Sequence, residues 1–399
     1  MTELPFAPVP GIRLGTAAAG IKRPDRDDVL LMEVAPGGSV AAVFTRNAFC
    51  AAPVRVARDH LTHAPRWLLV NSGNANAGTG ERGMVDALRS CEAVAALTGG
   101  ACVQVLPFST GVIGEYLPVD RIEAALPFAL ASLDENAWGR AALAIMTTDT
   151  RPKLVSRSVE VSGRSLTITG IAKGAGMIHP NMATMLSFIA TDARIAQPVL
   201  QACLARVADE TFNCITVDGD TSTNDACVLV ASGVASGSEL AVGSPDLQCF
   251  EAALAAVCGD LAEAIVRDGE GATKLMRIRV EEAASSAEAR AVGLTIAHSP
   301  LVKTAFFASD PNWGRILAAV GRAGVNELDI DRVGVWLNDV AIVTAGARSP
   351  DYTEEAGQAV MAQSDITVRV ALGRGQAAQT VLTCDLSYDY VRINADYRT

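Results

Sequence analysis

The sequence predicts an α/β protein of layered sheets and helices, and two observations lead to this class. Short apolar segments typical of strands alternate along the chain with segments whose apolar residues recur at helical spacing. In addition, 50% of the 399 residues are hydrophobic and 19% are charged, which supplies a large buried core and excludes a disordered chain. A chain of this length is expected to form two domains.

The first predicted elements lie in the N-terminal third of the chain. Residues 66–71 form a short apolar run that opens into a loop rich in Gly and Asn at 71–80, so a strand followed by a loop is expected. Residues 83–97 carry apolar side chains near i, i+4 and i+7 spacing, which predicts a helix. Residues 103–106 predict a second strand, which runs into the glycine-containing segment 107–114.

The middle of the chain predicts a β-hairpin and two helices. Residues 153–161 and 165–170 have the composition of strands, and the turn-forming pair Ser162-Gly163 separates them. The apolar spacing in residues 198–211 and 245–267 predicts a helix in each segment.

After about residue 274 the pattern changes to shorter strand-like segments. Residues 275–280 mix apolar and basic side chains, and residues 366–372 place an apolar side chain at every second position. Residues 379–385 continue in the same style. The segment 373–375, which begins and ends with Gly, predicts a hairpin between these last two strands.

This change of pattern places a domain boundary at Ala272 to Lys274. It gives an expected core domain of residues 1–274 and a smaller C-terminal α/β domain of residues 275–399. No internal repeat or long linker separates the two parts.

Composition and charge exclude several classes of protein. The formal net charge of −11 argues against a nucleic-acid partner, and no apolar run is long enough for a membrane helix. The first ten residues lack the basic and apolar regions of a signal peptide. The 9 cysteines contain no C-x-x-C pair and the 4 histidines show no metal-ligand spacing, so we expect reduced thiols, no metal and a cytoplasmic protein.

The segment with the most chemical information is Lys173-Gly-Ala-Gly-Met-Ile-His-Pro-Asn-Met-Ala-Thr-Met-Leu186, centred on the Ala183–Thr184 bond. If that bond breaks, Thr184 gains a free α-amine beside its hydroxyl, which makes a nucleophile with its own base. The reference pKa of such an amine is about 7.7–8.0, against ~10.4 for lysine, so a useful fraction is neutral near pH 7.

Bends at Gly174, Gly176 and Pro180-Asn181 could hold the scissile bond in a strained conformation. The residue types alone leave an alternative open, namely an ordinary Gly/Pro turn that leads into a buried strand at residues 185–189.

Ser109-Thr110-Gly111 follows a predicted strand and is expected in a glycine-containing turn. Such a turn can aim a backbone N–H and a hydroxyl at one point, as an oxyanion hole requires. A simple strand-ending turn is the alternative.

The segment 173–186 resembles the self-cleavage segment of the ArgJ family, the glutamate N-acetyltransferases of arginine biosynthesis, also called ornithine acetyltransferases. Further segments resemble the same family, in the family's order and over nearly the whole chain. They are Asn71–Ala77, Ser109–Gly114, Met146–Thr150, Thr216–Asp225, Arg267–Lys274, Ser309–Arg315 and Ile393–Thr399.

The resemblance implies an ArgJ/DmpA-like self-processing fold, with mixed sheets sandwiched by helices and a smaller C-terminal domain. It also implies self-cleavage between Ala183 and Thr184. The resulting alpha chain (residues 1–183) and beta chain (residues 184–399) are expected to stay together, as a heterotetramer of two each.

The family's site residues are carried over by motif position. Thr184 would be the nucleophile, and Thr110 with Gly111 would form the oxyanion hole. We infer that Lys173 pairs with the carboxylate of N-acetylornithine and that Glu270 pairs with its side-chain amine. The implied substrate contacts are Thr147, Lys173, Thr184, Glu270, Asn394 and Thr399.

The implied reaction is a ping-pong acetyl transfer without a cofactor or metal. Thr184 would take acetyl from N-acetylornithine, releasing ornithine, and pass it to glutamate to give N-acetylglutamate. The resemblance leaves acetyl-CoA open as a second donor. The alternatives are a self-processing amidohydrolase or aminopeptidase with an N-terminal threonine, and a non-catalytic amino-acid-binding protein on the same scaffold.

Overall fold

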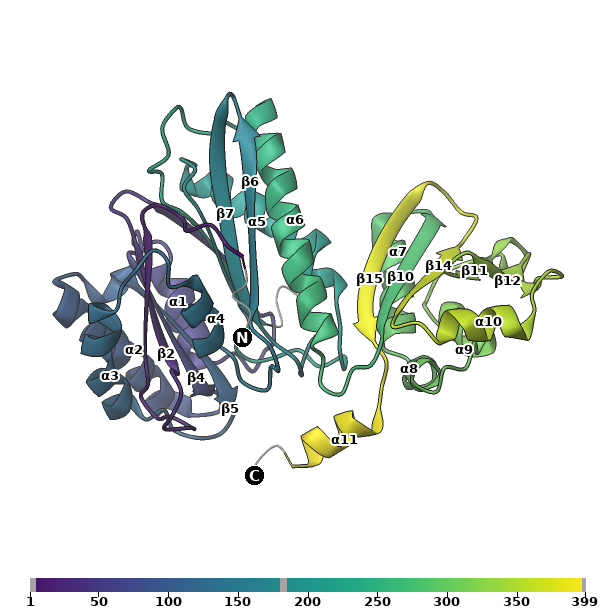
Figure 1. Cartoon of the computed structure of the whole chain (residues 1–399), viewed down its shortest axis with the longest axis horizontal. Helices are drawn as coiled ribbons and strands as arrows, with labels where there is room; N and C mark the ends of the chain where they lie inside the picture. Colours follow the sequence, from purple (N-terminus) through teal and green to yellow (C-terminus); the bar gives the residue numbers. More distant parts are fainter. Residues whose placement is uncertain (1–4, 180–184, 397–399) are drawn as a thin grey trace. The chain divides into compact units, whose positions relative to one another are not determined.

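The computed structural model describes residues 5–179 and 185–396 (Figure 1). The chain divides into two compact units, residues 1–213 with 221–265 and residues 214–220 with 266–399. Helix α6 (Pro245–Arg267) runs from the first unit into the second. The domain boundary at Ala272 to Lys274 stays a prediction.

The first unit contains two mixed sheets. One has the strand order β1-β2-β4-β5, in which only β4 and β5 are parallel. The other has the order β3-β9-β8-β7-β6, in which only β8 and β9 are parallel. The strands are β1 (Ile12–Ala17), β2 (Val29–Val34), β3 (Ser39–Phe44), β4 (Trp67–Asn74), β5 (Val105–Val112), β6 (Lys153–Val161), β7 (Arg164–Lys173), β8 (Leu186–Thr191) and β9 (Ala226–Ala231).

Helices cover the outer faces of these two sheets (Figure 1). Helices α1 (Ala52–His60), α2 (Gly80–Thr98) and α3 (Val119–Ala131) share a core with the first sheet. Helix α5 (Gln197–Glu210) contacts β3 and β9, and α6 lies against β7. Helix α4 (Trp138–Ala144) contacts strands of both sheets. The unit is therefore a helix–sheet–sheet–helix sandwich.

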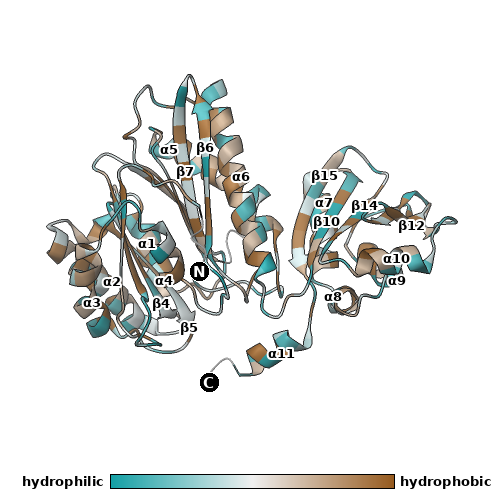
Figure 2. Ribbon diagram, viewed as in Figure 1, coloured by the Kyte–Doolittle hydropathy of each residue, from teal (hydrophilic) through white to brown (hydrophobic). Residues whose placement is uncertain are grey.

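The alternation of side chains along a strand explains why both faces of β2 are apolar. Leu30 and Met32 belong to the core between the two sheets, whereas Val29 and Leu31 belong to the core under the helices. Phe108 on β5 meets Phe188 on β8 edge to face, with ring centroids 5.1 Å apart, which fixes one sheet against the other. Bands of hydrophobic and hydrophilic residues also alternate along β6 and β7 (Figure 2).

The second unit has one six-stranded sheet with the order β13-β12-β11-β14-β10-β15. Its strands are β10 (Leu275–Ala283), β11 (Gly334–Leu337), β12 (Val340–Thr344), β13 (Ala347–Arg348), β14 (Asp365–Ala371) and β15 (Ala377–Cys384). Its helices are α7 (Ser286–Ala297), α8 (Pro300–Phe307), α9 (Trp313–Gly321), α10 (Glu354–Met361) and α11 (Tyr388–Ala395). Helix α7 packs on β10 and β15, and all helices except α11 contribute to one core.

The structure confirms the predicted hairpin at Ser162-Gly163, since β6 and β7 pair antiparallel on either side of it. The second predicted hairpin, at residues 373–375, is wrong. Strand β10 lies between β14 and β15, parallel to the first and antiparallel to the second. The amides of Arg374 and Gly375 bond to the carbonyl of Glu282 at the end of β10. Alternation shows which face of a strand is buried but not which strand is its neighbour.

Across the described residues, no helix carries an apolar stretch long enough to cross a membrane.

Candidate active site

Ser109, Thr110 and Gly111 lie inside β5, so the expected turn after the strand is wrong. The ladder between β4 and β5 includes the pair Gly73 and Gly111 and reaches Asn74 and Val112, with a register irregularity between Gly73 and Asn74. Gly111 has φ of +135°, and a Cβ there would lie 2.2 Å from the carbonyl carbon of Gly73. Only glycine permits this close approach of the two backbones.

Buried amide side chains hold the end of β5 in place. Asn71 donates to the carbonyl of Asn74 (2.9 Å) and accepts from the Ser109 hydroxyl (2.5 Å). Asn224 donates to the carbonyl of Ser109 (3.0 Å), the peptide that precedes Thr110. These bonds satisfy buried backbone groups beyond the regular ladder, so the Asn-rich loop has a structural role.

Two of the predicted site residues meet within the first unit. The Lys173 ammonium donates a hydrogen bond to the Thr110 hydroxyl at 3.1 Å. Lys173 is the last residue of β7 and is half-buried, and Thr110 is buried near the end of β5. The two residues come from different sheets, and so the packing of the sandwich brings them together.

A buried carboxylate, Asp149, organises the surroundings of Lys173. It accepts hydrogen bonds from the backbone amides of Thr147 (2.9 Å) and Gly174 (2.7 Å) and from the ammonium of Lys153 (2.6 Å). Burial alone would raise the pKa of Asp149, but Lys173, Lys153 and these hydrogen bonds outweigh it and lower the pKa to about 2. Asp149 is therefore ionised. It interacts both with Thr147, which is a predicted substrate contact, and with the charge of Lys173.

A second buried carboxyl, Asp225, precedes β9. Burial raises the pKa of Asp225 well above its usual range, although its hydrogen bonds with Ser222 and the charge of Lys173 oppose this. Its Oδ2 atom has no hydrogen-bond partner among the described residues. The ammonium groups of Lys173 and Lys153 both act on the Asp149 carboxylate. Burial of Asp225 thus works against a second negative charge beside these two cations.

Sequence reasoning missed Asp149 and Asp225 as site residues. Both lie in segments that resemble the family, 146–150 and 216–225. That resemblance was the feature of the sequence that could have pointed to them. A single acidic residue in a polar segment does not show from its neighbours whether it is buried or which cation it faces.

The other described pair of predicted residues lies in the second unit. The side-chain amide of Asn394, on α11, donates to the carboxylate of buried Glu270 at 2.8 Å. Ser387, the N-cap of α11, donates to the carbonyl of Gly271 (2.6 Å). Tyr390 donates to Asp218 (3.3 Å), and burial together with this carboxylate raises the pKa of Tyr390. Helix α11 is thereby attached to the loops of its own unit.

Ala183, Thr184 and Thr399 lie outside the described residues. The chain on both sides of the predicted cleavage bond is described, because Lys173 on β7 pairs with Leu186 on β8. Gly174 has a φ of +149°, and a bend follows at residues 175–177, which include Gly176. The predicted bend at Pro180 and Asn181 lies outside the described residues. A buried strand, β8, does begin at Leu186, as the alternative interpretation of this segment expected.

Among the described residues, no three His, Cys, Asp or Glu side chains lie close enough together to hold a metal ion. The buried ring of His60 instead lies with Nδ1 2.8 Å from the carbonyl oxygen of Val105, a structural contact.

Comparison with known proteins gives consistent matches over the whole chain. The model of the ArgJ family matches residues 13–399. The chain is 67% identical over 399 residues to the arginine biosynthesis bifunctional protein ArgJ of Methylococcus capsulatus, covering 100% of this chain and 98% of that protein. It is 56% identical over 393 residues to the protein of the same name from Pseudomonas syringae pv. tomato, covering 98% and 97%.

A solved structure shows the same fold. The crystal structure of the arginine biosynthesis bifunctional protein ArgJ from Bacillus halodurans matches with a TM-score of 0.52 and 44% sequence identity. The match covers 53% of this chain and 99% of that chain.

Proposed function

This chain belongs to the ArgJ family, and from that premise we propose how it works as an acetyltransferase of arginine biosynthesis. It cleaves itself between Ala183 and Thr184, and Thr184 then carries acetyl from N-acetylornithine to glutamate. The products are ornithine and N-acetylglutamate. Acetyl-CoA is a second candidate donor, in keeping with the word bifunctional in the names of the relatives.

The observation that carries this proposal is the hydrogen bond from Lys173 to the Thr110 hydroxyl. Because Thr110 Oγ1 accepts from Lys173, its own proton is available to donate elsewhere. The nearby ammonium polarises this hydroxyl and strengthens it as a donor. Thr110 and the backbone of Gly111 thereby have the character of an oxyanion hole, in which one donor contributes about 3 kcal/mol to lowering the barrier.

The reaction follows from these roles. The Thr184 hydroxyl attacks the acetyl carbonyl while its α-amine takes the proton, and the negative oxygen is stabilised by Thr110 and Gly111. The intermediate collapses to an acetyl-threonine ester, and ornithine leaves with the returned proton. The amine of glutamate then attacks the ester and restores Thr184. Water must be excluded during the ester stage, because it would hydrolyse the ester.

Charge supports the assignment of the substrate groups. The cluster of Lys173, Lys153 and Asp149 has an excess of positive charge, which suits the substrate carboxylate. Glu270 is buried and its carboxylate is oriented by Asn394, so it is suited to bind the side-chain ammonium of ornithine. The full set of proposed substrate contacts is Thr147, Lys173, Thr184, Glu270, Asn394 and Thr399.

The sheet topology supports a protein that stays assembled after cleavage. Strand β7, before the cleavage bond, pairs with β8, after it, through six residue pairs in the middle of one sheet. The ArgJ chain from Bacillus halodurans matches about half of this chain, as a cleaved fragment would. We propose that the two fragments form a cytoplasmic heterotetramer of two alpha and two beta chains.

The intact mass of the purified protein, measured alongside an acetyl-transfer assay, tests this proposal. We expect two fragments that separate at Ala183–Thr184, and ornithine release that depends on glutamate. Thr184→Ala should give one uncut chain without transfer. Ornithine release independent of glutamate would indicate the amidohydrolase alternative. An active protein that remains uncut would contradict the mechanism.

A further inference from the structure

A second candidate site lies on the first unit, at the outer edge of strand β3. This strand is the last in the order β3-β9-β8-β7-β6, so in the described part of the chain one of its edges has no neighbouring strand. A groove of about 470 Å³ follows this edge and is lined by Ala42–Asn47, Cys50, Arg58 and Gln201. The residues of the candidate active site do not line it.

The strand edge supplies a backbone donor to this groove. The side-chain amide of Gln201, on α5, accepts from the Ala42 N–H (3.1 Å) and donates to the Ala42 carbonyl (3.0 Å). Alternate residues of an edge strand turn their N–H groups to the same side. Phe44, two residues further on, therefore presents its N–H to the groove that it also lines.

Among the described residues, the charged residues of the lining are both arginines, Arg46 and Arg58, and none is acidic. Arg58 is held in place, because it donates to the Thr45 carbonyl (3.2 Å) and lies 5.5 Å from the centre of the Phe44 ring. Burial raises the pKa of the Cys50 thiol, and the positive charges of Arg58 and Arg55 oppose this rise. Arg55 is therefore a third arginine whose charge is felt at the groove. The groove is locally basic in a chain of formal net charge −11.

We propose that this groove binds a phosphate-bearing small molecule. Guanidinium groups match the geometry of phosphate oxygens, and a strand-edge N–H adds a further donor. The volume lies within the ~300–1,000 Å³ typical of small-molecule sites, more than free phosphate would fill. The ligand is therefore an organic molecule with its phosphate at the two arginines. The site needs neither Thr184 nor self-cleavage, and so it stands independently of the proposed acetyl transfer.

The groove is connected to the candidate active site through the residues around it. Asn47 donates to the carbonyl of Thr221 (2.8 Å), and the hydroxyl of Thr221 donates to the carbonyl of His179 (3.0 Å). His179 lies four residues before Ala183 in the sequence. A molecule in the groove would thus contact Asn47, whose hydrogen bond to Thr221 leads to the segment before the predicted cleavage bond.

Titration calorimetry on the purified full-length protein tests the proposal, with ADP and coenzyme A as phosphorylated probes. Adenosine and inorganic phosphate, which carry the two parts of ADP separately, are the comparison ligands. We expect both phosphorylated probes to bind more tightly than either half. Arg46→Ala and Arg58→Gln should each weaken ADP binding about tenfold, the scale of one charge-assisted hydrogen bond. Arg140→Ala, an exposed arginine on α4, removes the same charge elsewhere and should leave binding unchanged.

Alkylation of cysteine locates the bound probe. Cys50 lines the groove and is partly accessible, whereas Cys249 is exposed on α6 and serves as the matched control. ADP should slow the reaction of Cys50 with iodoacetamide and leave that of Cys249 unchanged, as measured by peptide mass spectrometry. Absence of ADP binding, ADP binding without protection of Cys50, or equal weakening by Arg140→Ala would overturn the proposal.

Discussion

The ammonium of Lys173, at the end of β7, donates a hydrogen bond to the hydroxyl of Thr110, near the end of β5, across 3.1 Å. These strands belong to different sheets of the sandwich. The contact therefore exists only when the two sheets pack, and it ties the proposed oxyanion hole to the inter-sheet core that contains Phe108 and Phe188.

Thr110→Val should lower turnover about 100- to 1,000-fold, because it removes a hydroxyl donor from the proposed oxyanion hole while keeping the shape of the side chain. The measurement is the rate of glutamate-dependent ornithine release at saturating N-acetylornithine. Thr110→Ser retains the hydroxyl and is the matched control. An equal loss in the two variants would show that the hydroxyl has no such role.

Gly111→Ala should destabilise the first unit by roughly 3 kcal/mol or more, since its Cβ would lie 2.2 Å from the Gly73 carbonyl carbon at a φ of +135°. Gly114→Ala is the control, because φ is also positive (+87°) but the added Cβ meets nothing within 4 Å. Denaturant unfolding measures the difference. A Gly114→Ala variant as unstable as Gly111→Ala would contradict the steric explanation.

Asp149→Asn should lower the free energy of unfolding by about 3–5 kcal/mol, because it leaves the Lys153 ammonium buried without its carboxylate. The pKa of Asp149 in the folded protein is about 2, below its ordinary value of 3.8. Its stabilising contribution is therefore complete above about pH 4 and is lost as the pH falls toward 2.

Unfolding measured across this pH range checks both parts of the Asp149 prediction. The asparagine variant should be less stable at neutral pH and should lack this portion of the acid dependence. Asp25→Asn, at an exposed carboxyl, is the control and should change the stability little. A wild-type stability that rises from pH 4 to pH 2 would contradict the sign of the prediction.

Deleting residues 394–399 should strongly reduce turnover and leave self-cleavage largely intact. The deletion removes Asn394, which orients the Glu270 carboxylate, together with Thr399. Asn394→Leu should raise KM for N-acetylornithine more than it lowers kcat. Arg392→Ala, on the same helix and paired with Asp389 at the surface, is the control. Unchanged kinetics in the truncated protein would exclude a substrate-binding role for this tail.

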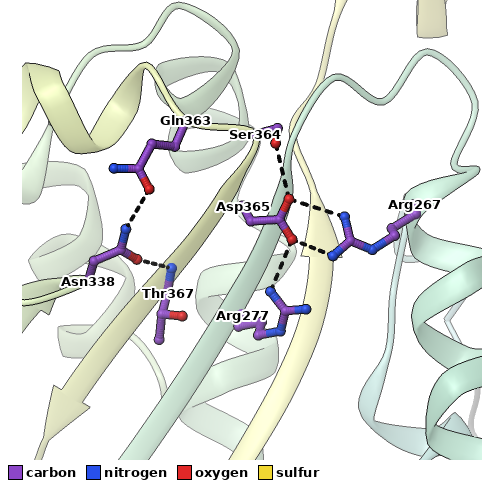
Figure 3. A network of polar contacts seen from close by, with 7 residues as sticks. All are labelled: Arg267, Arg277, Asn338, Gln363, Ser364, Asp365 and Thr367. Carbon is purple, nitrogen blue, oxygen red and sulfur yellow. Dashed lines mark hydrogen bonds and ion pairs between the residues drawn. The ribbon is translucent and has the colours of Figure 1, made fainter.

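Asp365→Asn should cost the second unit about 1 kcal/mol or less. Figure 3 shows Asp365 between Arg267 and Arg277, with Ser364 donating to the same carboxylate. The hydrogen bond from Arg267 is the main reason why the pKa of Asp365 falls to about 2, so the contribution is lost as the pH drops below about 4. The side chains are about one-third exposed, and water and salt screen the pairs.

Thermal unfolding at low and high salt measures the effect of Asp365→Asn. The difference from wild type should shrink as the salt concentration rises. A difference that grows with salt would contradict an electrostatic origin. Asn338→Ala is a comparison within the same region, because Asn338 accepts from the Thr367 amide (2.8 Å) without carrying a charge (Figure 3).

Local pattern predicted the elements whose neighbours are close in sequence. The hairpin at Ser162-Gly163 and the helix at residues 245–267 follow from turn residues and from apolar periodicity. The hairpin predicted at residues 373–375 failed because β10, about 90 residues earlier, takes the place between its two strands. Strand pairing between distant segments depends on packing, which periodicity does not encode.

The sequence by itself determined the layered α/β class, through the alternation of strand and helix patterns, and the family, through the order of its motifs. The residues of a self-cleaving acetyl carrier came from the resemblance to that family and stay a proposal. Only the tertiary structure decided that Thr110 lies within a strand, that it meets Lys173, and that Asp149 is ionised while Asp225 is driven toward its neutral form. The physical reason is burial. The charge of a carboxyl group depends on how much water it loses and which cation it faces, and both are set by segments far apart in the chain.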